Sequence, residues 1–125
     1  MTVVLDTNAL MMPVECDLRL FEELERVLGD VEPVVPRAVL AELEKLAGGA
    51  GEEATAASVG RDLAERCTVR ETTATYADDA VRELASAADV EYAVTNDAPL
   101  RERLLDAGVS VLSLRGSDKL AITQP

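Results

Sequence analysis

Two apolar runs in this sequence end at a carboxylate with small polar residues beside it. Residues 2–8 read TVVLDTN and residues 91–97 read EYAVTND, so Asp6 and Asp97 each follow a run typical of a buried strand. Carboxylates that converge on one point repel one another at neutral pH unless a cation lies between them. Sites built only from oxygen suit the hard ions Mg²⁺ and Mn²⁺. The two runs therefore indicate a divalent-metal site if the fold brings their ends together.

Two further acidic positions can join such a site from helical patterns. Glu42 borders the apolar stripe of the helix that we expect at residues 37–49. Asp79 lies in the first turn of the helix expected at residues 76–89, where a carboxylate also interacts favourably with the helix dipole. Asp78 stands beside it, so either member of this pair could face inward.

The absence of histidine limits the catalytic mechanisms and metal sites that this chain can form. The chain contains no His, which excludes Ser-His-Asp triads and the common His-containing zinc sites. A divalent ion held by carboxylates can activate water as a nucleophile and stabilise charge on a phosphodiester without His. Taken singly, each acid also has an ordinary explanation as a helix cap, a turn former or a solvated residue. Only their combination indicates a site.

The elements that would position these acids alternate along the chain. We expect strands at residues 2–5, 32–36, 68–72, 91–97 and 109–114, and helices at residues 17–29, 37–49, 53–67, 76–89 and 98–108. Residues 115–125 show no clear pattern and read as a C-terminal tail.

This alternation predicts an α/β fold, in which a central parallel sheet is flanked by helices in three layers. With 125 residues, the chain forms one domain over residues 1–125. Sites in such folds gather at the carboxyl ends of the strands. Asp6 and Asp97 should therefore share one edge of the sheet.

The charge balance admits two explanations. The formal net charge is −12, from 24 acidic and 12 basic residues, and such a surface repels nucleic acid and favours basic partners or cations. Near-molar salt, however, shortens the Debye length to about 3 Å, so a dense acidic surface is tolerated there and keeps a protein dissolved. The preference for Arg over the two lysines, Lys45 and Lys119, fits a halophilic, salt-loaded cytosol.

The expected compartment is the cytoplasm. No stretch is long and apolar enough to cross a bilayer, and the N-terminus lacks the pattern of a signal peptide. Cys16 and Cys67 form no CxxC pair and read as reduced thiols. We expect no membrane association and no organic cofactor.

Four segments carry a resemblance to a known family. VVLDTNALM, PVVPRAVLAELEKL, YADDAVRELA and YAVTNDAPLRERLLDAGVSVLSLRG occur in this order and cover nearly the whole chain. Together they resemble the PIN domain, a family of metal-dependent ribonucleases. The resemblance implies a PIN-like fold and an endoribonuclease that uses Mg²⁺ or Mn²⁺ to hydrolyse RNA phosphodiester bonds.

The resemblance also implies roles for particular residues. Its acid quartet would be Asp6, Glu42, Asp79 and Asp97, with Asp79 preferred over Asp78 because Asp79, Val81 and Leu84 follow the family's spacing. Asn8, Thr95 and Asn96 would orient those carboxylates or contact phosphate, as supporting residues.

Basic residues near the motifs are candidates for contact with RNA. Arg37 opens the helix that carries Glu42, and Arg101 and Arg103 follow TND. The forms ADDA and TNDAPLRERL are similar to the archaeal branch that resembles rRNA-processing nucleases, which implies a role in rRNA processing. Because several family members self-associate, we also expect a homodimer.

Three alternatives remain open at this stage. The first is a toxin-type PIN ribonuclease paired with an antitoxin. The second is a PIN-like scaffold that binds RNA or ribosomal partners without cleaving RNA. The third is a phosphatase of the haloacid dehalogenase type, but that class needs a second Asp where this chain has Asn8.

Overall fold

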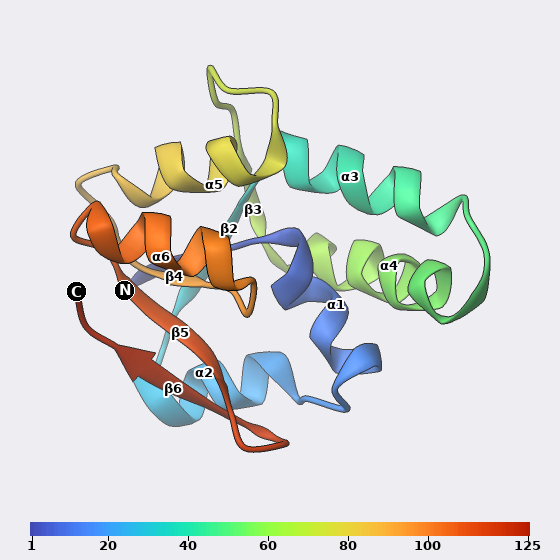
Figure 1. Ribbon diagram of the computed structural model, residues 1–125, viewed down its shortest axis with the longest axis horizontal. Coiled ribbons are helices and arrows are strands. Elements are labelled where there is room, and N and C mark those ends of the chain that lie inside the picture. Colours follow the sequence, from blue (N-terminus) through green and yellow to red (C-terminus); the bar gives the residue numbers. More distant parts are fainter.

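The most apolar run of the N-terminus forms the central strand of the molecule. A computed structural model, which describes all 125 residues, places β1 (Thr2–Leu5) inside a six-stranded sheet (Figure 1). Val3, Val4 and Leu5 are fully buried. Because helices cover both faces of the sheet, this strand needs apolar side chains on both sides, as its continuous run of Val and Leu provides.

The remaining elements follow in alternation. The other strands are β2 (Glu32–Pro36), β3 (Thr68–Arg70), β4 (Val90–Val94), β5 (Ser110–Arg115) and β6 (Lys119–Thr123). The helices are α1 (Thr7–Glu15), α2 (Leu20–Leu28), α3 (Arg37–Ala47), α4 (Gly51–Leu63), α5 (Ala77–Ala85) and α6 (Ala98–Asp106), with a 3₁₀ turn at Ala64–Arg66. None of these helices is long and apolar enough to span a membrane.

The strand order is β3-β2-β1-β4-β5-β6, and all neighbours are parallel except β5 and β6. The chain therefore proceeds from β1 toward one edge and then returns to the other side of β1 with β4. This reversal creates a switch point between the carboxyl ends of β1 and β4, where open α/β sheets form their binding crevices. The α/β architecture predicted from the sequence is confirmed.

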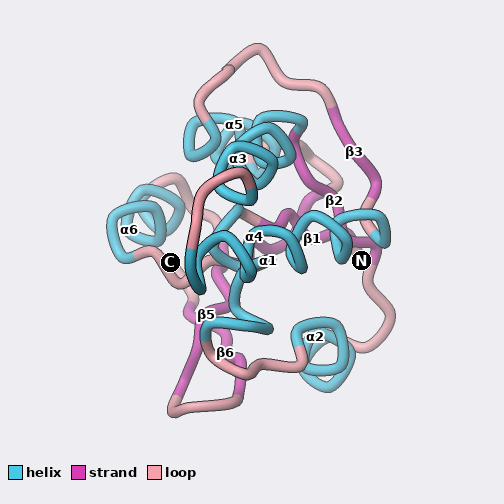
Figure 2. Tube along the Cα trace, turned by 90° about the vertical axis from the view of Figure 1, so that its right-hand side faces the viewer, coloured by secondary structure: helices cyan, strands magenta, loops and turns pink.

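The helices form the outer layers. Helices α5 and α6 lie on one side of the sheet and α2 lies on the other, as the two perpendicular views show (Figures 1 and 2). Helix α1 packs against α4, and α3 packs against both α4 and α5. Helices α1, α3, α4 and α5 are thus joined by contacts with one another, and α5 also packs against β1.

One helix was missing from the expectations. Helix α1 occupies Thr7–Glu15, a stretch in which the apolar pattern predicts no helix. Pro13 lies inside this helix, where proline is normally disfavoured. Residues 9–12 are all buried, so the helix has no polar face over these positions and shows no amphipathic period.

The expectation of a patternless tail at residues 115–125 was wrong, because Lys119–Thr123 form β6. This strand pairs with β5 in an antiparallel hairpin, and the turn contains Gly116 with a φ of 68°. A short edge strand with only one fully buried large side chain, Leu120, leaves a weak pattern in the sequence.

Helix α2 fixes this edge strand through an ion pair. Both carboxylate oxygens of Glu23 accept hydrogen bonds from the Arg26 guanidinium, and one of them also accepts from the Leu120 backbone N–H at 2.8 Å. Arg26 in turn donates to the Leu120 carbonyl at 3.0 Å. The outward backbone groups of Leu120 are therefore paired, although β6 has no further strand beside it. These bonds hold the pKa of Glu23 at about 2, chiefly through Arg26.

Gly60 allows α4 to approach α1 closely. A Cβ atom at this position would lie 2.7 Å from the backbone oxygen of Leu10 and 3.2 Å from a methyl group of Leu43. The nearest atom belongs to the backbone and cannot move aside easily. A glycine inside this helix therefore has a packing reason.

We predict that Gly60→Ala destabilises the protein by about 1–3 kcal/mol, the range for overpacked cores. The added methyl group must push α4 away from α1. Gly48→Ala is the matched control, because a Cβ there would meet no atom closer than 3.5 Å. Chemical denaturation should show a lower midpoint for Gly60→Ala only, and equal stability of the two variants would contradict the packing argument.

We predict that Glu23→Gln lowers stability by about 1 kcal/mol at neutral pH, through loss of charge-assisted hydrogen bonds to Arg26. Since the folded-state pKa of Glu23 lies below its ordinary value of 4.5, its contribution is present above about pH 4.5 and is lost as pH falls toward 2. Thermal unfolding of the variant and the wild type should therefore converge near pH 2. Glu22→Gln is the control, since Glu22 and Arg19 form a strongly exposed pair. A gap that stayed constant with pH would argue against the ion pair as its cause.

Candidate active site

The register between β1 and β4 brings the ends of the two sequence runs together. Leu5 of β1 pairs with Val94 of β4. Asp6 directly follows Leu5, and Thr95 directly follows Val94. The Asp6 backbone N–H donates to the Val94 carbonyl at 3.3 Å. The Thr95 hydroxyl donates to one oxygen of the Asp6 carboxylate. The two runs predicted to share an edge of the sheet therefore do so.

Both strand-end acids also begin helices. The other carboxylate oxygen of Asp6 accepts from the Ala9 N–H at 2.6 Å and caps α1. Asp97 caps α6 by accepting from the Leu100 N–H at 3.0 Å. These acids can therefore cap helices and also belong to a metal site, because the capping hydrogen bond fixes where each carboxylate points.

Amide side chains join the two loops that carry these acids. The Asn8 side-chain oxygen accepts from the Asn96 N–H at 2.9 Å, and the Asn96 side-chain oxygen accepts from the Leu114 N–H at 3.3 Å. The Thr95 hydroxyl also accepts from the Asp97 N–H at 3.0 Å. The polar residues around Asp6 and Asp97 therefore connect three neighbouring strands at their carboxyl ends.

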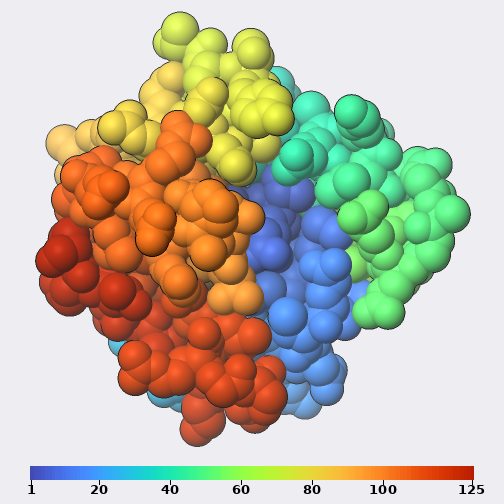
Figure 3. Space-filling view, viewed as in Figure 1, coloured from blue at the N-terminus to red at the C-terminus, as the bar shows by residue number.

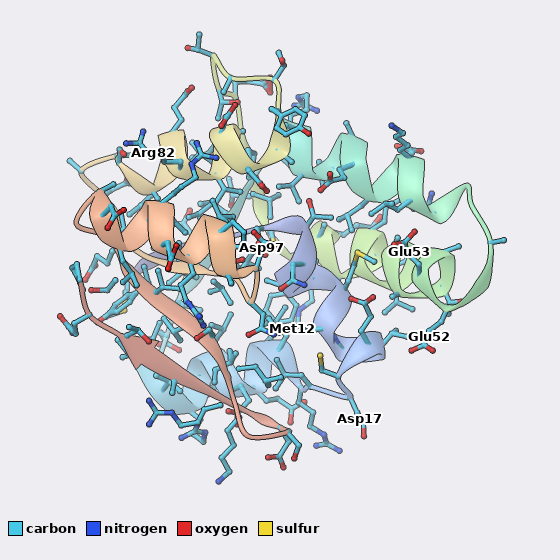
Figure 4. The ribbon with its side chains drawn as sticks, viewed as in Figure 1. Met12, Asp17, Glu52, Glu53, Arg82 and Asp97 are labelled. Carbon is cyan, nitrogen blue, oxygen red and sulfur yellow. The ribbon has the colours of Figure 1, made fainter.

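An acidic cleft of about 360 Å³ opens at this point. Its lining consists of Asp6, Thr7, Asn8, Met11, Glu15, Glu42, Leu46, Glu53, Asp78 and Asp97. In Figure 3, the blue N-terminal segment lies recessed between the orange segment that contains α6 and the cyan and green segments that contain α3 and α4. In Figure 4, Asp97 lies beside α1, and Glu53 lies on α4 on the other side of this cleft. Six of the ten lining residues are acidic and none is basic, so the cleft has a strongly negative potential.

The electrostatics show that the acids affect one another. Burial raises the pKa of Asp6 to about 7; the carboxylates of Asp78 and Asp97 add to this effect, and hydrogen bonds from Thr95 and Ala9 oppose it. Partial burial, followed by the charges of Asp97 and Glu42, also raises the pKa of Asp78. Asp78 is thus within electrostatic reach of Asp6, Asp97 and Glu42, which come from three other elements, and such a gathering of like charges favours a cation.

The neighbouring residues Asp78 and Asp79 lie in different environments. Asp78 is half-buried and lines the cleft, whereas Asp79 is exposed and accepts a hydrogen bond from Arg103 at 2.7 Å. Consecutive residues on a helix point about 100° apart, so only one of the two can face the cleft. The preference for Asp79 over Asp78 as the inward residue does not match this placement.

The basic residues named from the sequence lie outside the cleft. Arg103 is occupied by Asp79, and Arg37 forms an ion pair with Glu71 at 2.6 Å. Arg101 on α6 forms no ion pair and does not line the cleft. The cleft itself therefore offers no guanidinium to a phosphate.

Sequence reasoning overlooked several lining residues. Thr7, Met11 and Glu15 project from α1 at intervals of four residues, the spacing that puts side chains on one face of a helix. Glu53 comes from the first turn of α4. The spacing on α1 was available as a signal, but it had no meaning until residues 7–15 were known to be helical.

The donor chemistry fits a hard divalent cation. The cleft presents oxygen atoms and no counter-charge, and the Thr7 hydroxyl is buried without a hydrogen-bond partner. In the present side-chain positions, no three acidic groups lie close enough together to hold one ion directly. Mg²⁺ ordinarily retains several of its waters and is held by one or two carboxylates, so the residues remain suited to it.

Comparison with known proteins identifies the family. A family model described as "PIN like domain" matches residues 3–117. The chain therefore belongs to the PIN-like domain family, as the four sequence motifs indicated. No curated protein sequence matches it significantly.

Solved structures share the fold over nearly the whole chain. The structure of the PIN domain endonuclease Utp24 is 28% identical, with a TM-score of 0.79, and the match covers 99% of this chain and 92% of that one. A domain of a functionally unknown protein from Methanocaldococcus jannaschii DSM 2661 is 20% identical, with a TM-score of 0.68 and 94% coverage of both chains.

The crystal structure of VapBC2 from Rickettsia felis bound to a DNA fragment from their promoter is 15% identical, with a TM-score of 0.67. This match covers 92% of this chain and 100% of that one. At this identity, and at that of the archaeal domain, the likeness concerns the fold.

We predict that Asp6→Asn raises the melting temperature by roughly 5 °C or more at pH 8 without divalent ions. The ionised carboxylate is buried beside other acids, and Asn keeps the acceptor that caps α1. Since the folded-state pKa of Asp6 lies above its ordinary value of 3.8, the penalty grows as pH rises toward 7 and vanishes near pH 4.

Asp62→Asn makes the same charge change at an exposed position on α4 and is the control. Calorimetry at pH 4 and pH 8 should show a pH-dependent gain for Asp6→Asn alone. A lower melting temperature of Asp6→Asn than of the wild type at pH 8 would mean that the ionised Asp6 carboxylate does not destabilise the fold.

Proposed function

We propose that the protein is a metal-dependent endoribonuclease that hydrolyses phosphodiester bonds of RNA in the acidic cleft. The observation that carries this proposal is the convergence of Asp6, Glu42, Asp78 and Asp97 from four elements, without a cation of the protein among them. Membership of the PIN-like family and the 28% identity to the PIN domain endonuclease Utp24 support it.

These four carboxylates would hold Mg²⁺ or Mn²⁺. When bound, such an ion lowers the pKa of water and neutralises charge on the phosphate under attack. We assign the inward position on α5 to Asp78, because it lines the cleft while Asp79 pairs with Arg103. One of the carboxylates takes the proton that the attacking water loses.

The surrounding residues orient this set. Thr95 and the α1 N-terminus each bind one oxygen of Asp6, so that carboxylate has a single fixed position. Asn8 uses its side-chain oxygen to bind Asn96, which leaves its side-chain NH₂ group to donate to a phosphate oxygen. These contacts provide the positioning that a hydrolytic site needs before substrate binds.

The comparisons favour the endonuclease reading over the toxin reading. Identity and TM-score are both higher for Utp24 than for the toxin–antitoxin complex VapBC2, at 28% and 0.79 against 15% and 0.67. Cleavage of rRNA, a cytoplasmic location and a homodimer stay predictions from the sequence.

We predict that Asp78→Asn and Asp97→Asn each reduce Mn²⁺-dependent RNA cleavage by about a hundredfold or more. Even groups that only orient metal ligands contribute about ten- to a hundredfold. Asp79→Asn, one residue away, is the matched control and should retain most of the activity. The measurement is cleavage of labelled single-stranded and structured RNAs in high KCl with Mn²⁺ or Mg²⁺.

Equal activity of the wild type, Asp78→Asn and Asp97→Asn would indicate a contaminating nuclease and remove the proposal. If Asp79→Asn were inactive and Asp78→Asn active, the assignment on α5 would be reversed. Mn²⁺ should also raise the melting temperature of the wild type more than that of Asp97→Asn, because an ion that binds only the folded state stabilises it by mass action.

A further inference from the structure

Tyr76 is an aromatic side chain exposed to solvent. It retains 73% of its accessible surface and immediately precedes α5. The other two aromatic residues, Phe21 and Tyr92, are partly buried against the core. An exposed tyrosine offers a flat apolar face, on which a nucleic acid base can stack without sequence preference.

The segment that carries Tyr76 is held in place by hydrogen bonds. The Glu83 carboxylate on α5 accepts from the backbone N–H groups of Thr73 and Ala74 at 2.8 and 3.0 Å. The Thr72 hydroxyl donates to the Ala74 carbonyl at 2.7 Å. Residues 72–76 therefore form a tied loop, and Tyr76 is presented from a fixed backbone.

A groove of about 250 Å³ lies between this loop and the first half of α3. Ala38 and Ala41 line it from α3, Thr72 and Thr75 line it from the loop, and the Arg37–Glu71 ion pair also borders it. The walls are small and weakly polar. Tyr76 follows the lining residue Thr75 directly in the chain but does not itself line the groove.

The groove adjoins the acidic cleft through two shared elements. On α3, Ala41 lines the groove and the next residue, Glu42, lines the cleft. At the start of α5, Tyr76 precedes the cleft residue Asp78 by two positions. A strand whose phosphate occupies the cleft could therefore place a neighbouring nucleotide over the groove.

We propose that this groove binds one nucleotide of single-stranded RNA beside the cleaved phosphate, with its base stacked on Tyr76 and a phosphate bound by Arg37. The proposal rests on the proposed function. It places the phosphate contact that the cleft lacks just outside the acidic residues. The side chains of Arg37 and Glu71 are 65% and 71% exposed, so their ion pair is weak and can be exchanged for a phosphate.

The test uses the Asp97→Asn background, so that RNA is bound but not cut. The probe is a 5′-labelled single-stranded RNA of mixed sequence with one 2-aminopurine, and binding is followed by anisotropy at fixed KCl. Tyr76→Ala should weaken binding by about tenfold to a hundredfold, and Tyr76→Phe, which keeps the aromatic face, should bind like the parent. The 2-aminopurine signal should change on binding in the parent and in Tyr76→Phe, but not in Tyr76→Ala.

The Arg37–Glu71 ion pair supplies a second test, in which substitutions of its two members should change RNA affinity in opposite directions. Arg37→Ala should weaken binding and reduce the slope of log K against log salt by about 0.7, the value for one phosphate contact on a single strand. Glu71→Ala removes the competing carboxylate and should tighten binding. A merely structural role of the pair would make both variants weaker.

Equal binding by the parent, Tyr76→Ala and Arg37→Ala would overturn the subsite, and so would an absence of RNA binding in the parent. Failure of the nuclease proposal is distinguishable, because it is read from cleavage by the wild type. A wild type that cleaves RNA with a KM unaffected by Tyr76→Ala would retain the proposed function and lose the subsite. If RNA binding depended on Tyr76 and Glu71 but the wild type never cleaved RNA, the subsite would be retained and the nuclease proposal would be lost.

Discussion

The burial of the Asp6 carboxylate is the constraint on which this structure depends. Only 3% of its surface is exposed, at the end of the central strand, and the charges of Asp78 and Asp97 add to the cost of ionising it. Two hydrogen bonds, from Thr95 and from the first turn of α1, offset part of this cost. Burying an ion is tolerable only where partners satisfy it. The N-terminus of α1 and the end of β4 are arranged around this one group.

The topology of the sheet makes the remaining arrangement possible. Because β4 returns beside β1 after the chain has passed through β2 and β3, residues about ninety positions apart become neighbours at one edge. Helices α3 and α5 then add Glu42 and Asp78 from the flanks. The fold concentrates like charges where no cation of the protein balances them, which costs stability. Conflicts of this kind between stability and local charge are typical of functional sites.

Under the proposed function, binding of the metal ion and binding of RNA need different surfaces. Carboxylates suit a divalent ion, but they repel a phosphate backbone, and the net charge of −12 adds to this repulsion. Under the proposed function, contacts that hold RNA must therefore lie beside the acids rather than among them. Arg37 lines the groove, and the exposed Tyr76 precedes the cleft residue Asp78 by two positions. An aromatic face there offers a base an uncharged surface for stacking.

The sequence by itself determined the architecture and the strand-end acids, because strands and helices leave different apolar periods and parallel strands end at one edge. It also contained the four motifs of the family. It did not reveal α1, whose buried residues and Pro13 leave no amphipathic pattern, nor β6, whose signal is a short edge strand. The tertiary structure decided that Asp78 rather than Asp79 faces the cleft, and that Glu15 and Glu53 extend it. Those choices depend on the rotation of each helix about its axis against its neighbours, which is set by packing between segments far apart in the chain.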